Sequence, residues 1–361
     1  MQKTLTRFLL LTLVLSLGFG QLLRFEYLGL PLYLHDCLVA LILLLNFPAL
    51  ARPVRTLASS LSLFLLGLAI GWLVALVLFP LSSLLIPSLY TLRLIAYLML
   101  YFLCKSSSFL IPHYYFLLSG ITCLTIGLSQ YFLLPDMRIF QYLGWDDHLF
   151  RLTLPHFDPT FTGVMLVLAI LSSNSLYSTN IFRLTSVVYI IGILLTYSRS
   201  VWLSLALTAA AFIRNKKILL VSGILLLSSI FLLPKKFGEG TNLLRIYSLT
   251  SRWQTDLAYA QKAGWTLLLG QGLNTLTPIT SPSSYPLHPS GPNNSYLYLL
   301  LTTGILGLLG WGKFMFSLYR TSSLKPMWLF FFVASLFNNV MFYPFALLWV
   351  LLVSATAPSE A

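Results

Sequence analysis

Residues 196–202 have the sequence TYSRSVW, which sets a single arginine, Arg199, between two apolar segments. From Leu184 to Ile213 it is the only charged residue. A continuous helix over this stretch would be about 45 Å long at roughly 1.5 Å per residue, which exceeds the roughly 30 Å of hydrocarbon in a bilayer. We therefore predict two short helices that meet at Ser198–Ser200.

An arginine held at membrane depth is costly unless it faces a cavity or an anionic partner. The position of Arg199 therefore indicates a functional site. The alternative is that its long side chain snorkels from a helix end to the lipid headgroups and has only a structural role.

The composition is typical of a protein that crosses a membrane many times. Of 361 residues, 58% are hydrophobic and 9% are charged, and the mean hydropathy of +0.85 exceeds what a soluble core requires. The net charge of +13 does not indicate nucleic-acid binding, because the basic residues are scattered between apolar runs. The three cysteines lack the spacing of metal ligands, so the sequence predicts neither a metal site nor a disulfide framework.

Apolar windows predict an all-α integral membrane fold of about eleven transmembrane helices, in one polytopic domain over residues 1–361. The predicted spans are 8–23, 31–50, 56–79, 84–104, 109–134, 159–177, 183–197, 200–214, 217–233, 294–317 and 327–353. The first span follows Lys3 and Arg7 and resembles a signal peptide. No small-x-small cleavage site follows it, so we favour an uncleaved helix.

The orientation follows from the basic residues in the short connections, which lie at alternate ends of the spans. The positive-inside rule makes those ends cytoplasmic. The loops 135–158 and 234–293 then lie on the extracytoplasmic side, together with the turn at Arg199. This alternation requires two crossings between Arg183 and Arg214, because one crossing would put these two residues on opposite faces.

The longer loop contains a predicted amphipathic helix. Leu249, Trp253 and Leu257 recur at helical spacing and form one apolar face, with Arg252 and Asp256 beside it. Such a helix would lie on the outer membrane surface or cap a cavity. Arg252 is either a binding residue or a member of an exposed ion pair with Asp256.

The same loop ends in HPSGPNNSYL, residues 288–297. Asn293 or Asn294 is suited to cap the N-terminus of the tenth span, and a helix N-terminus favours an anion. Two asparagines with His288 just before them exceed what capping requires, so this segment belongs to the candidate site.

Several short motifs, taken in order, resemble those of the O-antigen ligase and O-antigen polymerase family. They are Ser198-Arg199-Ser200, Arg252-Trp253, Gly270-Gln271-Gly272-Leu273-Asn274, and Asn293 to Leu297 leading to Thr303-Gly304-Ile305-Leu306-Gly307. An upstream block, from Gly144 to Arg151 and from Phe157 to Gly163, is similar to another recurring block of that family. The resemblance covers residues 140–310, and the earlier spans agree only in hydropathy.

The resemblance implies a multi-helix membrane glycosyltransferase of GT-C-like architecture with an extracytoplasmic capping loop. Members of the family transfer a glycan from a lipid carrier, usually undecaprenyl diphosphate, to an acceptor on the outer face of the cytoplasmic membrane. They require no nucleotide sugar, metal or other cofactor. By the same resemblance, Arg199 and Arg252 would bind the diphosphate and stabilise the charge that develops on it.

One position departs from the family pattern. Members usually carry a histidine, proposed to orient or deprotonate the acceptor hydroxyl, where this chain has Asn293, and an asparagine cannot act as a base. Either His288 supplies the base, or a carboxylate does, or the chain is catalytically altered. The candidate catalytic residues are His288, Asn293 and Asp158, and the candidate substrate-binding residues are Asn294, Arg151 and Asp147, of which Asp147 and Asp158 are the carboxylates considered as bases.

Two further charges, Asp36 and Arg93, lie inside predicted spans. Either they pair and hold the second and fourth spans together, or Arg93 adds a positive charge to a cavity.

We therefore predict a multi-pass glycosyltransferase of the cytoplasmic (inner) membrane that acts in surface polysaccharide or lipopolysaccharide biosynthesis, with its active site facing the extracytoplasmic side. Its partners would be a polyprenyl-diphosphate-linked glycan donor, a glycan or lipid acceptor and membrane lipid, with no nucleic acid. Ligases and polymerases of the family share these motifs, so the motifs do not distinguish the two activities. The alternatives are a transporter or flippase of lipid-linked glycans, which would place ionisable residues near the membrane midplane, and a catalytically altered family member.

Overall fold

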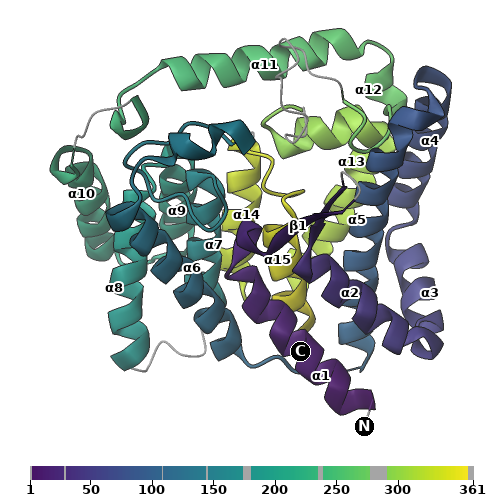
Figure 1. Ribbon diagram of the computed structural model, residues 1–361, viewed down its shortest axis with the longest axis horizontal. Coiled ribbons are helices and arrows are strands. Elements are labelled where there is room, and N and C mark those ends of the chain that lie inside the picture. Colours follow the sequence, from purple (N-terminus) through teal and green to yellow (C-terminus); the bar gives the residue numbers. More distant parts are fainter. Residues whose placement is uncertain are drawn as a thin grey trace.

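In a computed structural model of the protein, the described residues are 2–27, 30–107, 109–143, 145–173, 180–234, 239–276 and 291–356. Most of them are helical, as predicted, and the helices pack into a bundle (Figure 1). The α-helices are α1 (Gln2–Leu17), α2 (Leu34–Leu45), α3 (Ala51–Ser60), α4 (Ser62–Leu78), α5 (Leu81–Ser107), α6 (His113–Leu133), α7 (Pro159–Ser172), α8 (Asn180–Leu195), α9 (Arg199–Phe212), α10 (Lys216–Leu232), α11 (Tyr247–Ala263), α12 (Thr266–Leu269), α13 (Ser295–Thr321), α14 (Lys325–Phe337) and α15 (Pro344–Thr356).

A short antiparallel hairpin joins α1 to α2. Strand β1 (Arg24–Tyr27) pairs with β2 (Leu30–Tyr33), with Arg24 opposite Tyr33. The predicted span 31–50 therefore begins as a strand and becomes helical only at Leu34.

Among the described residues, α5, α6 and α13 are each long and apolar enough to cross a membrane. The helices α3 and α4 meet this criterion together, but the chain bends by 83° between them, so the predicted span 56–79 is divided. Serines flank the bend, and Ser59 Oγ donates to the carbonyl of Thr56 at 3.1 Å. Serine hydroxyls compete with the helix for backbone hydrogen bonds, which favours a break here. The fold is that of an all-α membrane protein.

The predicted span 327–353 also consists of two helices. The helix α14 ends at Phe337, Asn338 is extended, and α15 begins at Pro344. The two consecutive amides, Asn338 and Asn339, favour a loop, and a proline is tolerated only in the first turn of a helix. The α15 helix is nearly all buried, and Asn338 in the break before it is buried as well.

The two helices predicted to meet at Ser198–Ser200 are confirmed. The helix α8 ends at Leu195, α9 begins at Arg199, and Tyr197 between them takes a positive φ of 51°. Arg151 is buried and stabilises this turn, because its Nε donates to the carbonyl of Thr196 at 3.0 Å and its Nη2 to that of Tyr197 at 3.3 Å.

The predicted amphipathic helix in the longer loop is confirmed as α11. It runs across one end of the bundle, from the side of α10 to α12 (Figure 1). The predicted apolar face, Leu249, Trp253 and Leu257, is exposed to the outside of the protein.

Glycines allow α4 and α13 to pack with their backbones in close contact. A Cβ at Gly67 would lie 2.3 Å from the backbone nitrogen of Gly307, and one at Gly71 would lie 2.5 Å from the carbonyl oxygen of Thr302. Small residues at such positions are what close packing of membrane helices requires.

We expect Gly67→Ala to force α4 away from α13 and to reduce stability by about 1–3 kcal/mol, the usual cost of overpacking. Gly223→Ala on α10 is the matched control, because a Cβ there meets nothing within 4 Å. Thermal melting of both purified variants measures the difference. Equal melting temperatures would show that this close packing is not needed.

Candidate functional site

A cavity of about 480 Å³ lies among segments that are far apart in the sequence. Its wall combines residues from 21–33, 90–97, 145–161, 273–274, 291–298 and 338–347, and Arg252 from α11. The wall is rich in aromatic rings and carries three arginines, Arg24, Arg93 and Arg252. A concave site of this size with a few convergent polar groups is typical of a ligand pocket.

Arg252 is held in the cavity wall by the loop that divides α14 from α15. Its Nη1 donates to Asn338 Oδ1 at 2.5 Å and to the carbonyl of Phe337 at 3.2 Å. Asn338 Nδ2 in turn donates to Ser200 Oγ at 2.9 Å. The residue next to Arg199 is therefore linked to Arg252 through a single amide side chain, and these bonds replace the exposed ion pair with Asp256 considered for Arg252.

Arg199 does not belong to the cavity wall. Its Nη1 donates to the carbonyls of Leu243 and Arg245, so it holds the segment that precedes α11. This contact fixes where α11 starts and contributes to placing Arg252.

The arginines of these segments interact through their charges. Burial lowers the pKa of the Arg151 guanidinium, and the positive charges of Arg245, Arg252 and Arg199 lower it further, while Asp158 opposes them. Such a concentration of positive charge favours an anionic ligand at the adjoining cavity.

Two carboxylates, Asp146 and Asp158, belong to the described cavity wall. Asp158 caps α7, because its Oδ1 accepts the backbone N–H groups of Thr160 at 2.6 Å and Phe161 at 3.0 Å. This cap fixes the carboxyl group relative to the helix. Asp147 is exposed and outside the wall.

The two consecutive asparagines have different roles. Of the two asparagines suited to cap α13, Asn294 is the cap, and its Oδ1 accepts from the backbone nitrogens of Tyr296 and Leu297 at 2.8 and 3.1 Å. Asn293 lines the cavity, and its backbone N–H donates to Asp256 Oδ1 at 2.7 Å. Asp256 therefore joins α11 to the segment just before α13. His288 lies outside the described residues.

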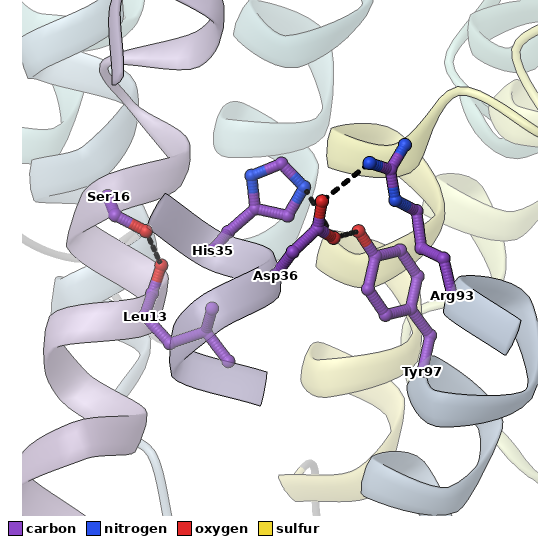
Figure 2. Close-up of polar contacts among 6 residues, drawn as sticks. All are labelled: Leu13, Ser16, His35, Asp36, Arg93 and Tyr97. Atoms are coloured by element: carbon purple, nitrogen blue, oxygen red, sulfur yellow. Dashed lines mark hydrogen bonds and ion pairs between the residues drawn. The ribbon is translucent and has the colours of Figure 1, made fainter. Parts of the chain in front are cut away.

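Asp36 and Arg93 form an ion pair, which is one of the two alternatives considered for these charges. Arg93 Nη2 on α5 lies 2.6 Å from Asp36 Oδ2 on α2, and Tyr97 donates its hydroxyl to Asp36 Oδ1 at 2.7 Å (Figure 2). The Arg93 guanidinium also lies over the rings of Tyr90 and Tyr33, 4.9 and 5.2 Å from their centroids. Because Arg93 also lines the cavity, it both holds α2 to α5 and adds positive charge to the site.

We expect Arg93→Asp to destabilise the protein by about 3 kcal/mol, since breaking a largely buried ion pair leaves a charge without compensation. The double variant Asp36→Arg with Arg93→Asp restores opposite charges and should recover part of this loss. Thermal melting of the two single variants and the double variant tests the pair. A double variant no more stable than the worse single variant would contradict a stabilising role.

One cluster near the cavity has the composition of a metal site. Asp146, His148 and Asp158 can offer ligand atoms within 4.8 Å of one another. Burial and the positive charge of Arg151 lower the pKa of His148 to about 4, and Arg245 acts in the same direction. Positive charges so close disfavour a cation, so we assign no metal to this cluster.

Several residues of the cavity wall were not among the sequence-based candidates. His156 and Tyr343 are bonded to each other there, and Asn338 holds Arg252. The sequence contains a pattern that could have indicated Asn338, because Asn338 and Asn339 interrupt an otherwise apolar predicted span. No sequence pattern indicated a role for His156, since a single histidine in a loop is usually exposed.

Comparison of the chain with protein-family models and with curated proteins gives no match. The likeness to the O-antigen ligase and polymerase family therefore rests on the short motifs and their order.

Proposed function

We propose that the protein is a membrane glycosyltransferase that moves a polyprenyl-diphosphate-linked glycan to a glycan or lipid acceptor. The observation that carries the proposal is the presence of Arg252, Asp158 and Asn293 in one cavity wall, although they lie in separate segments of the sequence. Arginine binds a diphosphate, a carboxylate can accept a proton, and an amide can hold a sugar hydroxyl. These are the groups that transfer from a diphosphate requires.

The proposed reaction is a direct inverting displacement. The acceptor oxygen forms a bond to the anomeric carbon of the donor and gives its proton to Asp158, whose Oδ2 is the oxygen not used in capping α7. The bond between the anomeric carbon and the diphosphate oxygen breaks, and its electron pair stays on the departing polyprenyl diphosphate. Arg252 stabilises that developing charge, and Arg199 adds to the positive field and holds the segment before α11.

The proposal includes the arrangement in the membrane expected from the sequence. About eleven helices would cross in a GT-C-like architecture, some at fewer than the usual 20 residues. The cavity and α11 would face the extracytoplasmic side, where the exposed face of α11 would contact lipid headgroups. Cysteine-accessibility labelling at Leu249 and at the α9–α10 connection checks the two sides.

The test is incubation of the purified protein in nanodiscs with a lipid-linked oligosaccharide and a set of candidate acceptors. Formation of the transferred product together with free polyprenyl diphosphate supports the proposal. Absence of both with every donor and acceptor in the set contradicts it.

Transport of the lipid-linked glycan is the competing class of function. A transporter would place ionisable groups near the middle of the bundle, and the helix-borne charges Asp36 and Arg93 are already paired with each other. Movement of a fluorescent lipid-linked glycan across proteoliposomes without chemical change would favour transport.

A further inference from the structure

Three polar side chains from distant parts of the chain form a hydrogen-bonded chain in the cavity wall. His156 Nδ1 lies 2.8 Å from the hydroxyl oxygen of Tyr343, and the Gln21 side chain is hydrogen-bonded to the same hydroxyl. All three residues line the cavity. His156 Nε2 and Gln21 Oε1 are buried and have no hydrogen-bond partner in the described structure.

The pattern of bonds fixes where the hydrogen atoms lie. Gln21 Oε1 has no hydrogen-bond partner among the described residues, so the amide nitrogen of Gln21 is the donor in its bond to the Tyr343 hydroxyl. The Tyr343 hydroxyl then donates its own hydrogen to His156 Nδ1. A neutral imidazole that accepts at Nδ1 carries its hydrogen on Nε2.

Backbone packing holds the His156 ring in this place. The backbone N–H of Gln21 donates to the carbonyl of Pro155 at 3.0 Å. A Cβ at Gly20 would lie 2.6 Å from His156 Nδ1, and Gly20 takes a positive φ of 50° that favours glycine. This close approach leaves the ring little freedom to turn away from Tyr343.

An imidazole that donates from Nε2 cannot take a proton from a substrate. Burial lowers the pKa of His156 to about 3, although Asp158 opposes this shift, so the ring is neutral at physiological pH. A buried donor without a partner is destabilising, and a hydrogen bond to a ligand oxygen would offset that cost. Asp158 acts electrostatically on His156, and both residues line the cavity.

We propose that His156 Nε2–H donates a hydrogen bond to the acceptor hydroxyl oxygen and so presents that hydroxyl to Asp158, with Tyr343 and Gln21 as the positioning residues that fix the imidazole tautomer. The inference rests on the proposed glycosyl transfer and names the residues that orient the nucleophile. This role is not that of a general base. It therefore differs from the role for which His288 or a carboxylate was considered, because this chain has Asn293 where family members usually carry a histidine. The proton still passes to Asp158.

Steady-state kinetics of three variants test this role. His156→Ala removes the donor and should lower kcat/KM for the acceptor by about tenfold or more, with the KM for the donor unchanged. His156→Gln keeps an amide N–H near the position of Nε2 and should retain activity within about threefold of the wild type. Tyr343→Phe should reduce activity in the wild-type background and cause no further loss in the His156→Gln background, since the tautomer no longer matters there.

The kinetic outcomes separate the possible roles of His156. Activity lost in His156→Gln as fully as in His156→Ala, with loss of the acidic limb of the pH profile, would show that His156 is the base and would overturn the inference. Equal decreases in kcat/KM for the donor and for the acceptor, with lower melting temperatures in all variants, would show that His156 has a purely structural role. That result would also overturn the inference.

A measurement that does not require activity separates failure of this inference from failure of the proposed function. Nitrogen-15 NMR of histidine-labelled protein, with the signal assigned by its loss in His156→Gln, should show an Nε2–H tautomer that does not titrate between about pH 5 and 8. An Nδ1–H tautomer, or titration in that interval, would refute the inference even in an active enzyme. If the protein gives the expected spectrum but has no transfer activity, the hydrogen-bonded chain and its tautomer are supported. Only the proposed glycosyltransferase function is then rejected.

Discussion

Arg252→Ala is expected to lower glycosyl transfer by about a hundredfold or more, the usual effect of removing one donor that stabilises developing charge. Arg252 is the arginine that α11 contributes to the cavity, and Asn338 fixes its guanidinium. Initial rates of polyprenyl diphosphate release measure the effect. The loss should be mainly in kcat, because the charge on the leaving diphosphate is greatest in the transition state.

Two further variants make this result specific. Arg252→Lys keeps the charge but cannot bind two phosphate oxygens through a planar fork, so its activity should lie between those of the wild type and Arg252→Ala. Arg138→Ala is the matched control, because Arg138 is exposed and forms a surface ion pair with Asp136 in the 135–158 loop. If Arg252→Ala were as active as Arg138→Ala, Arg252 would have no part in transfer.

Asp158→Asn is expected to reduce transfer by about a hundredfold or more, since it removes a general base. The fold should be preserved, because an asparagine oxygen can accept the same two N–H groups at the start of α7 and asparagine is as good a cap as aspartate. Unchanged thermal melting together with the loss of rate would assign the effect to chemistry and not to folding.

The other proposed bases provide the comparison for Asp158. Asp147→Asn should retain the activity of the wild type, because Asp147 is exposed and outside the cavity wall. His288→Ala completes the set. A fully active Asp158→Asn with an inactive His288→Ala would move the base to His288 and contradict the proposed mechanism.

Local sequence patterns predicted the helices that depend on local signals. The single charge at Arg199 indicated the junction of α8 and α9, and the spacing of Leu249, Trp253 and Leu257 indicated α11. The pair Asn293 and Asn294 was recognised as containing a cap, which is Asn294. Each of these depends on residues within a few turns of one another. The divisions at Leu61 and at Asn338 were missed, because window-averaged hydropathy does not respond to a short polar interruption.

The composition of the cavity wall could be predicted only in part. Asp158, Asn293 and Arg252 were recognised from motifs, but Arg199 lies outside the wall and Arg151 stabilises the backbone at Thr196. Which side chains meet in space depends on helix packing, and hydropathy says nothing about which face of a span points inward. His156, Tyr343 and Gln21 were missed for this reason.

The cavity joins the first and last parts of the described chain, since Gln21 and Arg24 share its wall with residues 338–347. A nascent chain on the ribosome therefore lacks a complete binding site until the residues at the start of α15 have been synthesised and inserted. For the proposed glycosyltransferase, no donor lipid would be processed during translation, and premature termination before that point would yield an inactive fragment. The order of biosynthesis would thus delay the proposed catalysis until assembly in the bilayer is nearly finished.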